Sequence, residues 1–238
     1  MMNDSKQENQ HANPADSVKK RGRPKCFNEQ QALEKAMMLF WQFGYEGTSI
    51  SDLTQALNIT APSLYGTFGD KTALFEKCIE YYSEHEVQPA EKILQAGQTA
   101  KIAMELYLYD SIQHLVQANK PKGCMVVVAT MNCSQQNQTV QEQLKQRRAY
   151  TKTKIMDRLA IGVQNSEIES LAHAEQLTDF YMTLLQGMTI QARDGMALTQ
   201  LQRMVSNAMK SWGLLAQGQI SMDYELNPNS SVALRQFS

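Results

Sequence analysis

Residues 60–71 read TAPSLYGTFGDK, and their side chains have the types and spacing needed to contact a nucleic acid. On a helical wheel at about 100° per residue, Leu64 and Phe68 share one apolar face, and Pro62 and Gly66 point away from it. Outward positions without bulk let a helix approach a surface closely, such as the floor of a DNA major groove. This stretch is therefore a candidate recognition helix.

Polar side chains flank this face. The hydroxyl of Tyr65 could donate a hydrogen bond to a phosphate. The ammonium of Lys71, at the start of the next helix, could bind a phosphate as well. Backbone N–H groups and the helix dipole favour an anion there as well. Base reading would rest on small hydroxyl groups and on apolar contact with thymine methyl groups. The candidate DNA-binding residues of this region are Thr48, Ser49, Ser51, Thr60, Ala61, Pro62, Ser63, Tyr65, Gly66, Thr67 and Lys71.

Two short helices joined by a tight turn must position these residues. Apolar residues at helical spacing in 53–57 predict the first helix, and Asn58, which tolerates a left-handed backbone, interrupts it. Thr48 or Ser49 can cap this helix, and Thr60 can cap the second, because a short oxygen-bearing side chain accepts from unpaired backbone N–H groups. The pattern is a helix-turn-helix.

At this point the chain resembles the TetR family of transcriptional regulators, through FWQFGYEGTSISDLTQALNITAPSLYGTFGDKTALF. The resemblance covers roughly residues 27–85 and is specific, because the capped turn, the Leu-Tyr pair, Phe68 and Lys71 fall in register. It implies a three-helix domain whose third helix reads DNA, with the first turn of a fourth helix clamping the backbone. Asn58 departs from the family's more frequent Gly.

A run of positive charge precedes this domain. Residues 1–18 are polar with few apolar side chains, and the next seven, KKRGRPK, contain Lys19, Lys20, Arg21, Arg23 and Lys25. The run could be a solvated basic linker. Alternatively, extended Arg-Gly-Arg fits the narrow minor groove of AT-rich DNA. The neighbouring helix-turn-helix favours the second interpretation.

Helical patterns predict an all-α fold throughout the rest of the chain. A helix from Asn28 to about Phe43 should stop at Gly44, and another should begin at Asp70 and end or bend at Pro89. The run at 125–129 has strand propensity, but we interpret it as a buried helix because an isolated strand would have no partner. Further helices are expected at 99–119, 123–133, 136–163, 167–192 and 197–216.

Composition narrows the class of protein. The 238 residues have a net charge of −1 and are 42% hydrophobic, with no apolar run near the roughly 18 residues of a membrane span. The polar start predicts a cytoplasmic protein without membrane association. The four cysteines lack CxxC pairing, so neither a metal site, a cofactor nor a disulfide framework is expected. With no localised catalytic constellation, an enzyme is disfavoured.

The last two long apolar faces and one cysteine raise further expectations. The helices at 167–192 and 197–216 could pack only on their own core, or could pair with those of a second subunit, as the TetR resemblance implies. Methionines after residue 100 suit a ligand cavity, but ordinary filling of a helical core would explain them nearly as well. Cys124 follows Gly123 at a predicted helix start, a placement similar to that in TetR-type redox or electrophile sensors. The alternative is an inert structural thiol, because a single buried cysteine usually has no reactivity.

Together these patterns predict a basic arm (1–25), a helix-turn-helix DNA-binding domain (26–85), a larger helical effector-binding and dimerisation domain (86–217) and a tail (218–238). The expected function is a homodimeric transcriptional regulator, a repressor by family habit. Its partners would be double-stranded DNA with a palindromic operator and an unknown small-molecule effector. The alternative is an architectural protein that binds AT-rich DNA without sensing an effector.

Overall fold

The computed structural model describes residues 28–131 and 133–218, so the predicted basic arm and most of the predicted tail lie outside the described part. Within these ranges the structure contains helices and no strand, which confirms the all-α prediction. The α-helices are α1 (Glu29–Gly47), α2 (Ile50–Leu57), α3 (Ala61–Phe68), α4 (Lys71–Tyr82), α5 (Gln88–Ala96), α6 (Ala100–Leu115), α7 (Met125–Met131), α8 (Gln138–Gln164), α9 (Leu171–Arg193), α10 (Leu198–Lys210) and α11 (Trp212–Ala216).

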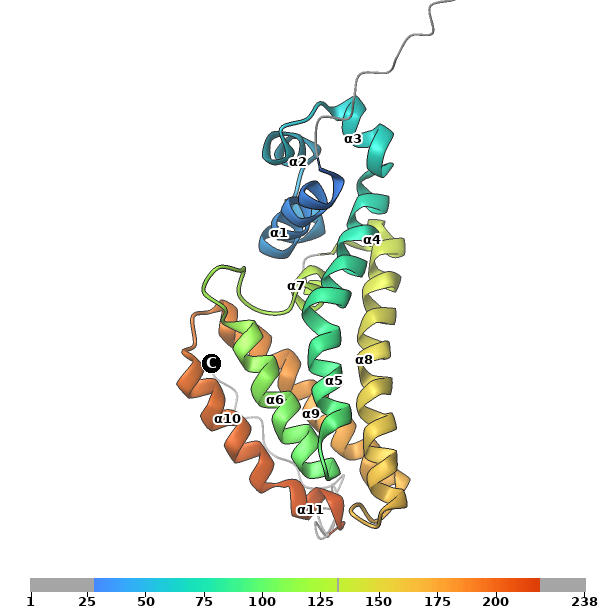
Figure 1. Ribbon diagram of the computed structural model, residues 1–238, viewed down its shortest axis with the longest axis vertical. Coiled ribbons are helices and arrows are strands. Elements are labelled where there is room, and N and C mark those ends of the chain that lie inside the picture. Colours follow the sequence, from blue (N-terminus) through green and yellow to red (C-terminus); the bar gives the residue numbers. More distant parts are fainter. Residues whose placement is uncertain (1–27, 132, 219–238) are drawn as a thin grey trace, which may run out of the picture.

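Helices α1 to α4 form a head at one end of the molecule, and the end of α4 leads into a body of longer helices (Figure 1). The side chain of Asn28 caps α1 by accepting from two backbone N–H groups. Helical geometry breaks at Gly44, whose φ is 75°, and one further turn ends at Gly47. The predicted stop at Gly44 is therefore a kink within a longer element.

The turn between α2 and α3 has the predicted geometry. Ser49 caps α2 in a reciprocal capping box with Asp52. Asn58 adopts the left-handed conformation with φ 53° and ψ 47°, and Thr60 accepts from the Ser63 N–H at the start of α3. Short side chains thus satisfy the otherwise unpaired N–H groups at each helix start.

Several helix boundaries differ from the sequence prediction. Helix α6 ends at Leu115 and not at 119, α9 begins at Leu171 and not at 167, and the single helix expected at 197–216 is divided into α10 and α11. Pro89 neither ends nor sharply bends the helix: a π-helical turn, Ser83–Val87, carries α4 directly into α5, where the proline occupies the first turn and needs no N–H partner. The helix expected at 123–133 is shorter, since α7 spans Met125–Met131. Cys124 and Cys133 therefore flank α7 instead of sharing one continuous helix.

The head does not have a core of its own. Its buried side chains, among them Phe40, Leu53, Leu64 and Phe75, belong to one cluster with residues of α7 and α8. Helix α7 lies between the head and the body in Figure 1 and packs on α1. A displacement of α7 must therefore disturb the packing of α1.

A second cluster forms the core of the body, from α5, α6 and α8 to α11. Most apolar residues of the two faces noted at 167–192 and 197–216 are buried in this core, including Leu177, Tyr181, Leu201 and Trp212. The periodic apolar faces thus pack largely within the chain. The large apolar side chains of α9 and α11 that remain exposed are Leu171, Phe180, Ile190 and Leu214.

Candidate DNA interface and ligand cavity

Helix α3 presents an outer face of small and polar side chains. Leu64 and Phe68 are buried against the head, as the sequence predicts. Gly66 is exposed, and apart from its chain neighbours and the backbone of its own helix no heavy atom of the described residues lies within 4 Å of the position that a Cβ would occupy. Tyr65, on the flank, is 48% exposed. Ser49, Ser51, Thr60, Pro62 and Ser63 are exposed, and Ala61 and Thr67 are half-buried.

Thr48 does not share this surface. Its side chain is fully buried and its hydroxyl donates to the carbonyl of Gly44 at 2.8 Å. This hydrogen bond stabilises the kink in α1 that the positive φ of Gly44 produces. The sequence expectation that Thr48 contacts DNA is corrected, because a buried hydroxyl cannot reach a phosphate.

Lys71 lies at the first position of α4, as expected, but its ammonium has neighbours within the head. Its Nζ sits 4.3 Å from the centroid of the Tyr45 ring. Burial lowers the pKa of Lys71, and the carboxylates of Glu46 and Asp52 oppose that change. To contact a phosphate, this lysine would have to leave the aromatic ring.

A cavity of about 290 Å³ opens in the body. Its walls come from α4, the π-helical turn, α5, α6, α7, α8 and α9, so many elements converge on it. It is lined by aromatic residues such as Tyr82, Tyr107 and Tyr150, by apolar residues such as Met182 and Leu185, and by several charged side chains. Such a mixed lining is typical of small-molecule sites.

Cys124 is part of this cavity wall and is half-buried. Burial is the largest cause that raises the pKa of the Tyr82 hydroxyl, and the charge and hydrogen bond of Cys124 raise it further. The Cys124 thiol therefore lies close to the Tyr82 hydroxyl. Cys78 is fully buried in the head core, and burial raises the pKa of its thiol. Of these two thiols, Cys124 is the one that a cavity ligand could reach.

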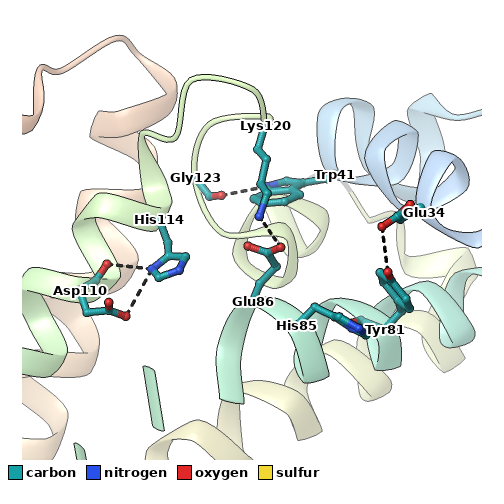
Figure 2. Close-up of polar contacts among 9 residues, drawn as sticks. All are labelled: Glu34, Trp41, Tyr81, His85, Glu86, Asp110, His114, Lys120 and Gly123. Atoms are coloured by element: carbon teal, nitrogen blue, oxygen red, sulfur yellow. Dashed lines mark hydrogen bonds and ion pairs between the residues drawn. The ribbon is translucent and has the colours of Figure 1, made fainter. Parts of the chain in front are cut away.

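Polar bonds connect the cavity wall to the head (Figure 2). The indole Nε1 of Trp41 on α1 donates to the carbonyl of Gly123 at 2.8 Å, in a buried position. Gly123 has φ +83° and immediately precedes Cys124. The Lys120 ammonium binds Glu86 of the π-helical turn at 2.5 Å. The loop before α7 therefore contacts both the head and the cavity wall.

Two further contacts hold the head from other sides. One carboxylate oxygen of Glu46 accepts from the Ser134 N–H at 3.0 Å, the Ser134 hydroxyl at 2.7 Å and the Asn137 amide at 2.5 Å. These bonds lower the pKa of Glu46. From α9, the guanidinium of Arg193 donates to the carbonyl of Gln42 at 3.2 Å.

The sequence analysis did not identify the residues that join the head to the body. Trp41 is 1% exposed in the core, and its bond to Gly123 spans 82 residues and has no sequence pattern. The same holds for Glu46 and Arg193, whose partners lie 88 to 152 residues away. The positions of the predicted Lys19, Lys20, Arg21, Arg23 and Lys25 fall outside the described residues.

These features define a helix-turn-helix protein with a ligand-sized cavity in an attached helical body. The model of the bacterial regulatory proteins, tetR family, matches residues 32–78. The transcriptional repressor ComR of Escherichia coli K12 is 31% identical over 199 residues, covering 82% of this chain and 93% of its own. The chain therefore belongs to the TetR family.

Other relatives agree with this assignment. The transcriptional repressor BdcR of Escherichia coli K12 is 29% identical over 180 residues, covering 76% of this chain and 86% of its own. A solved structure of a cysteine mutant of the TetR family regulator CifR, complexed with a 26-bp double-strand operator DNA, has a TM-score of 0.77. It is 29% identical and covers 80% of this chain and 100% of its own. No helix in the described ranges is long and apolar enough to cross a bilayer.

Proposed function

We propose that this protein is a cytoplasmic transcriptional repressor that binds a palindromic operator as a homodimer, without catalytic activity. The unobstructed outer face of α3 carries the proposal, since Gly66 and Pro62 are exposed between the polar flanks. Relatives that cover most of the chain are named repressors, and the similar CifR structure contains operator DNA. In this proposal residues 26–85 form the DNA-binding unit and residues 86–217 the sensing and dimerisation unit.

The test is selection of bound duplexes from a random pool with the purified full-length chain. A palindrome with two half-sites about one helical turn apart is expected for two α3 helices in successive major grooves. Graded binding without a preferred sequence would instead indicate an architectural DNA-binding protein. Tyr65→Phe and Lys71→Ala should weaken binding to all duplexes alike, because phosphate contacts position the protein without specifying bases.

The basic arm is proposed to supply most of the non-specific affinity. Between residues 26 and 75, acids outnumber bases, so the head attracts DNA poorly, whereas residues 19–25 hold five positive charges. If four or five of these charges contact DNA, deleting residues 1–25 should flatten the log–log salt slope by roughly 4. The preferred half-site should stay the same. If the arm is only a solvated linker, the deletion should change the salt slope by less than the value of about one phosphate contact.

For regulation, we propose that a small molecule or a redox change in the cavity weakens operator binding through α7. Cys124 lines the cavity at one end of α7, and Gly123 beside it accepts from Trp41 in the head. At the other end of α7, Ser134 and Asn137 bind Glu46. A ligand or an oxidised thiol that shifts α7 would therefore strain both attachments of α1.

Thiol sensing is tested by titrating operator release with hydrogen peroxide and with N-ethylmaleimide. Cys124→Ser should keep basal operator affinity and lose the release. Cys133→Ser is the matched control, because this thiol lies at the opposite end of α7 and outside the cavity lining. Full release from the Cys124→Ser protein would remove Cys124 from the mechanism.

The proposed dimer uses the exposed remainder of the last helices. Leu171, Phe180 and Ile190 on α9 and Leu214 on α11 stay exposed in one subunit. Burying such side chains between subunits would stabilise a four-helix interface. Phe180→Asp should shift the sedimentation coefficient to that of a monomer, whereas Ile102→Asp on α6 should not. An unchanged dimer in the first variant would place the interface elsewhere.

A further inference from the structure

Glu91 on α5 is a charged group of the cavity wall whose bonding is incomplete. Its Oε1 is inaccessible to solvent and has no hydrogen-bond partner among the residues of the described ranges. Burial raises the pKa of Glu91, and the charge of Lys154 only opposes this change. A buried acceptor without a donor is costly, and native proteins leave few of them.

The other charged groups that line the cavity have partners. Glu86 pairs with Lys120 at 2.5 Å, and Arg147 faces Glu80 at 3.9 Å. Arg148 donates to the hydroxyl of Thr130. The His114 Nδ1 contacts the backbone carbonyl of Asp110 at 2.9 Å and lies 3.3 Å from the carboxylate Oδ2. Among the described residues this Oδ2 is also a buried acceptor without a hydrogen-bond partner, but Asp110 is not part of the cavity lining. In the described part of the chain no ion pair includes Glu91.

Aromatic rings border the cavity near this carboxylate. Burial raises the pKa of the Tyr107 hydroxyl, and the charge of Glu91 raises it further. Tyr107 therefore lies near the Glu91 carboxylate. Tyr150, which also lines the cavity, already has the Lys154 ammonium 5.1 Å from its ring centroid. The negative face of an aromatic ring attracts cations. An acid beside tyrosine rings is a suitable environment for an organic cation.

We infer that the cavity binds an organic cation, a protonated primary amine on an apolar body, whose N–H donates to Oε1 of Glu91. The ammonium would satisfy the buried acceptor, and the apolar body would pack on Met182 and Leu185. At about 290 Å³ the cavity is at the small end for ligand sites, which favours a compact amine. As a statement about the effector, the inference rests on the proposed function.

The test compares three probes that share one apolar body: 4-phenylbutylamine, 4-phenylbutan-1-ol and 5-phenylvalerate. Their affinities for the full-length protein are measured by calorimetry. The amine should bind about tenfold or more tightly than the alcohol, because a charge-assisted hydrogen bond to a buried group is strong. Glu91→Gln should abolish this preference. Glu84→Gln, which changes an exposed acid of the π-helical turn outside the lining, should retain it.

Two results would overturn the inference. One is equal affinity for the amine and the alcohol in the wild-type protein, a comparison that needs no variant to fold. The other is tightest binding of 5-phenylvalerate with loss in Arg148→Gln, which would make the site an anion site. Release of operator DNA is measured separately. Glu91-dependent amine binding without operator release would support the ligand class and count against the proposed effector role.

Discussion

The head is built from short capped helices, whereas the body also uses a buried charged side chain that bonds over a long distance along the chain. In the head, the side chains of Ser49, Thr60 and Asp70 each accept from a backbone N–H three residues further on. In the body, the buried guanidinium of Arg158 reaches the carbonyl of Gly97, 61 residues away. Local caps of the same kind also begin α6 and α9, at Thr99 and Ser170. What the body adds is the buried long-range bond of Arg158, which holds separate elements to one another.

The head and the body also differ in how closely other atoms approach their glycines. A Cβ at Gly97 would lie 2.4 Å from the Cα of Ala103 on α6, and one at Gly162 would lie 2.7 Å from the Cβ of Ala100. At Gly66 on α3 the corresponding position is open. The body therefore depends on side-chain size at its helix crossings, while the outer face of α3 can change without disturbing the fold.

The largest expected effect is that of Gly97→Ala. The methyl group would clash with the backbone of α6, which cannot move aside as a flexible side chain can, so we expect a loss of about 3 kcal/mol in the free energy of unfolding. Urea denaturation followed by circular dichroism measures it. The matched control is Gly213→Ala on α11, where a Cβ would meet no described heavy atom within 4 Å beyond its chain neighbours and its own helix backbone. Equal stability of the two variants would contradict the contrast between the regions.

Trp41→Phe should have the next largest effect, because it acts where the two regions meet. The phenyl ring fills much of the same space, but the buried carbonyl of Gly123 loses its donor, at a cost of about 1–2 kcal/mol. The variant should also transmit cavity occupancy less well to the operator. Trp212→Phe, in the body core, should lower stability without changing the response of operator affinity to ligand. The same response in both variants would exclude the Trp41 contact from the coupling.

The local character of the head explains why its structure was predictable from sequence. Caps at Ser49 and Thr60 and the left-handed turn at Asn58 are properties of adjacent residues, and the structure confirms them. The prediction that Thr48 contacts DNA was wrong, because the kink at Gly44 buries its side chain. A propensity for a turn or cap can be read from four residues, but burial cannot.

The body was predictable only in outline. Helical periodicity predicted its helices, yet the continuation through Pro89 and the end of α7 at Met131 depend on neighbouring elements. The cavity and its bonds to the head join residues too far apart for any spacing rule. One usable signal did exist: acids precede both His114 and His173 by four residues, and both pairs form in the structure.

Glu46→Gln should have a smaller effect that depends on pH. The Ser134 and Asn137 donors lower the folded-state pKa of Glu46. Its contribution is therefore present above its unfolded pKa of about 4.3 and is lost as the pH falls through the folded pKa. Because the carboxylate is exposed, we expect less than about 1 kcal/mol. The stability difference from wild type should be measurable at about pH 7 and disappear near pH 3. Glu76→Gln, which replaces another exposed acid, this one on α4, is the matched control.

The smallest change in stability is expected for Gly66→Ala, and its sign is opposite to that of Gly97→Ala. Glycine within a helix costs roughly 0.5–1 kcal/mol relative to alanine, and the open space beside Gly66 accepts a methyl group, so the variant should be more stable by about that amount. The same methyl group would project from the face of α3 that we propose enters the major groove. Operator affinity should fall by about tenfold, equivalent to about 1.4 kcal/mol, in a fluorescence anisotropy titration. Gly213→Ala on α11 provides the comparison, because it should retain full operator affinity. A Gly66→Ala protein with raised stability and unchanged affinity would show that the outer face of α3 does not approach DNA closely.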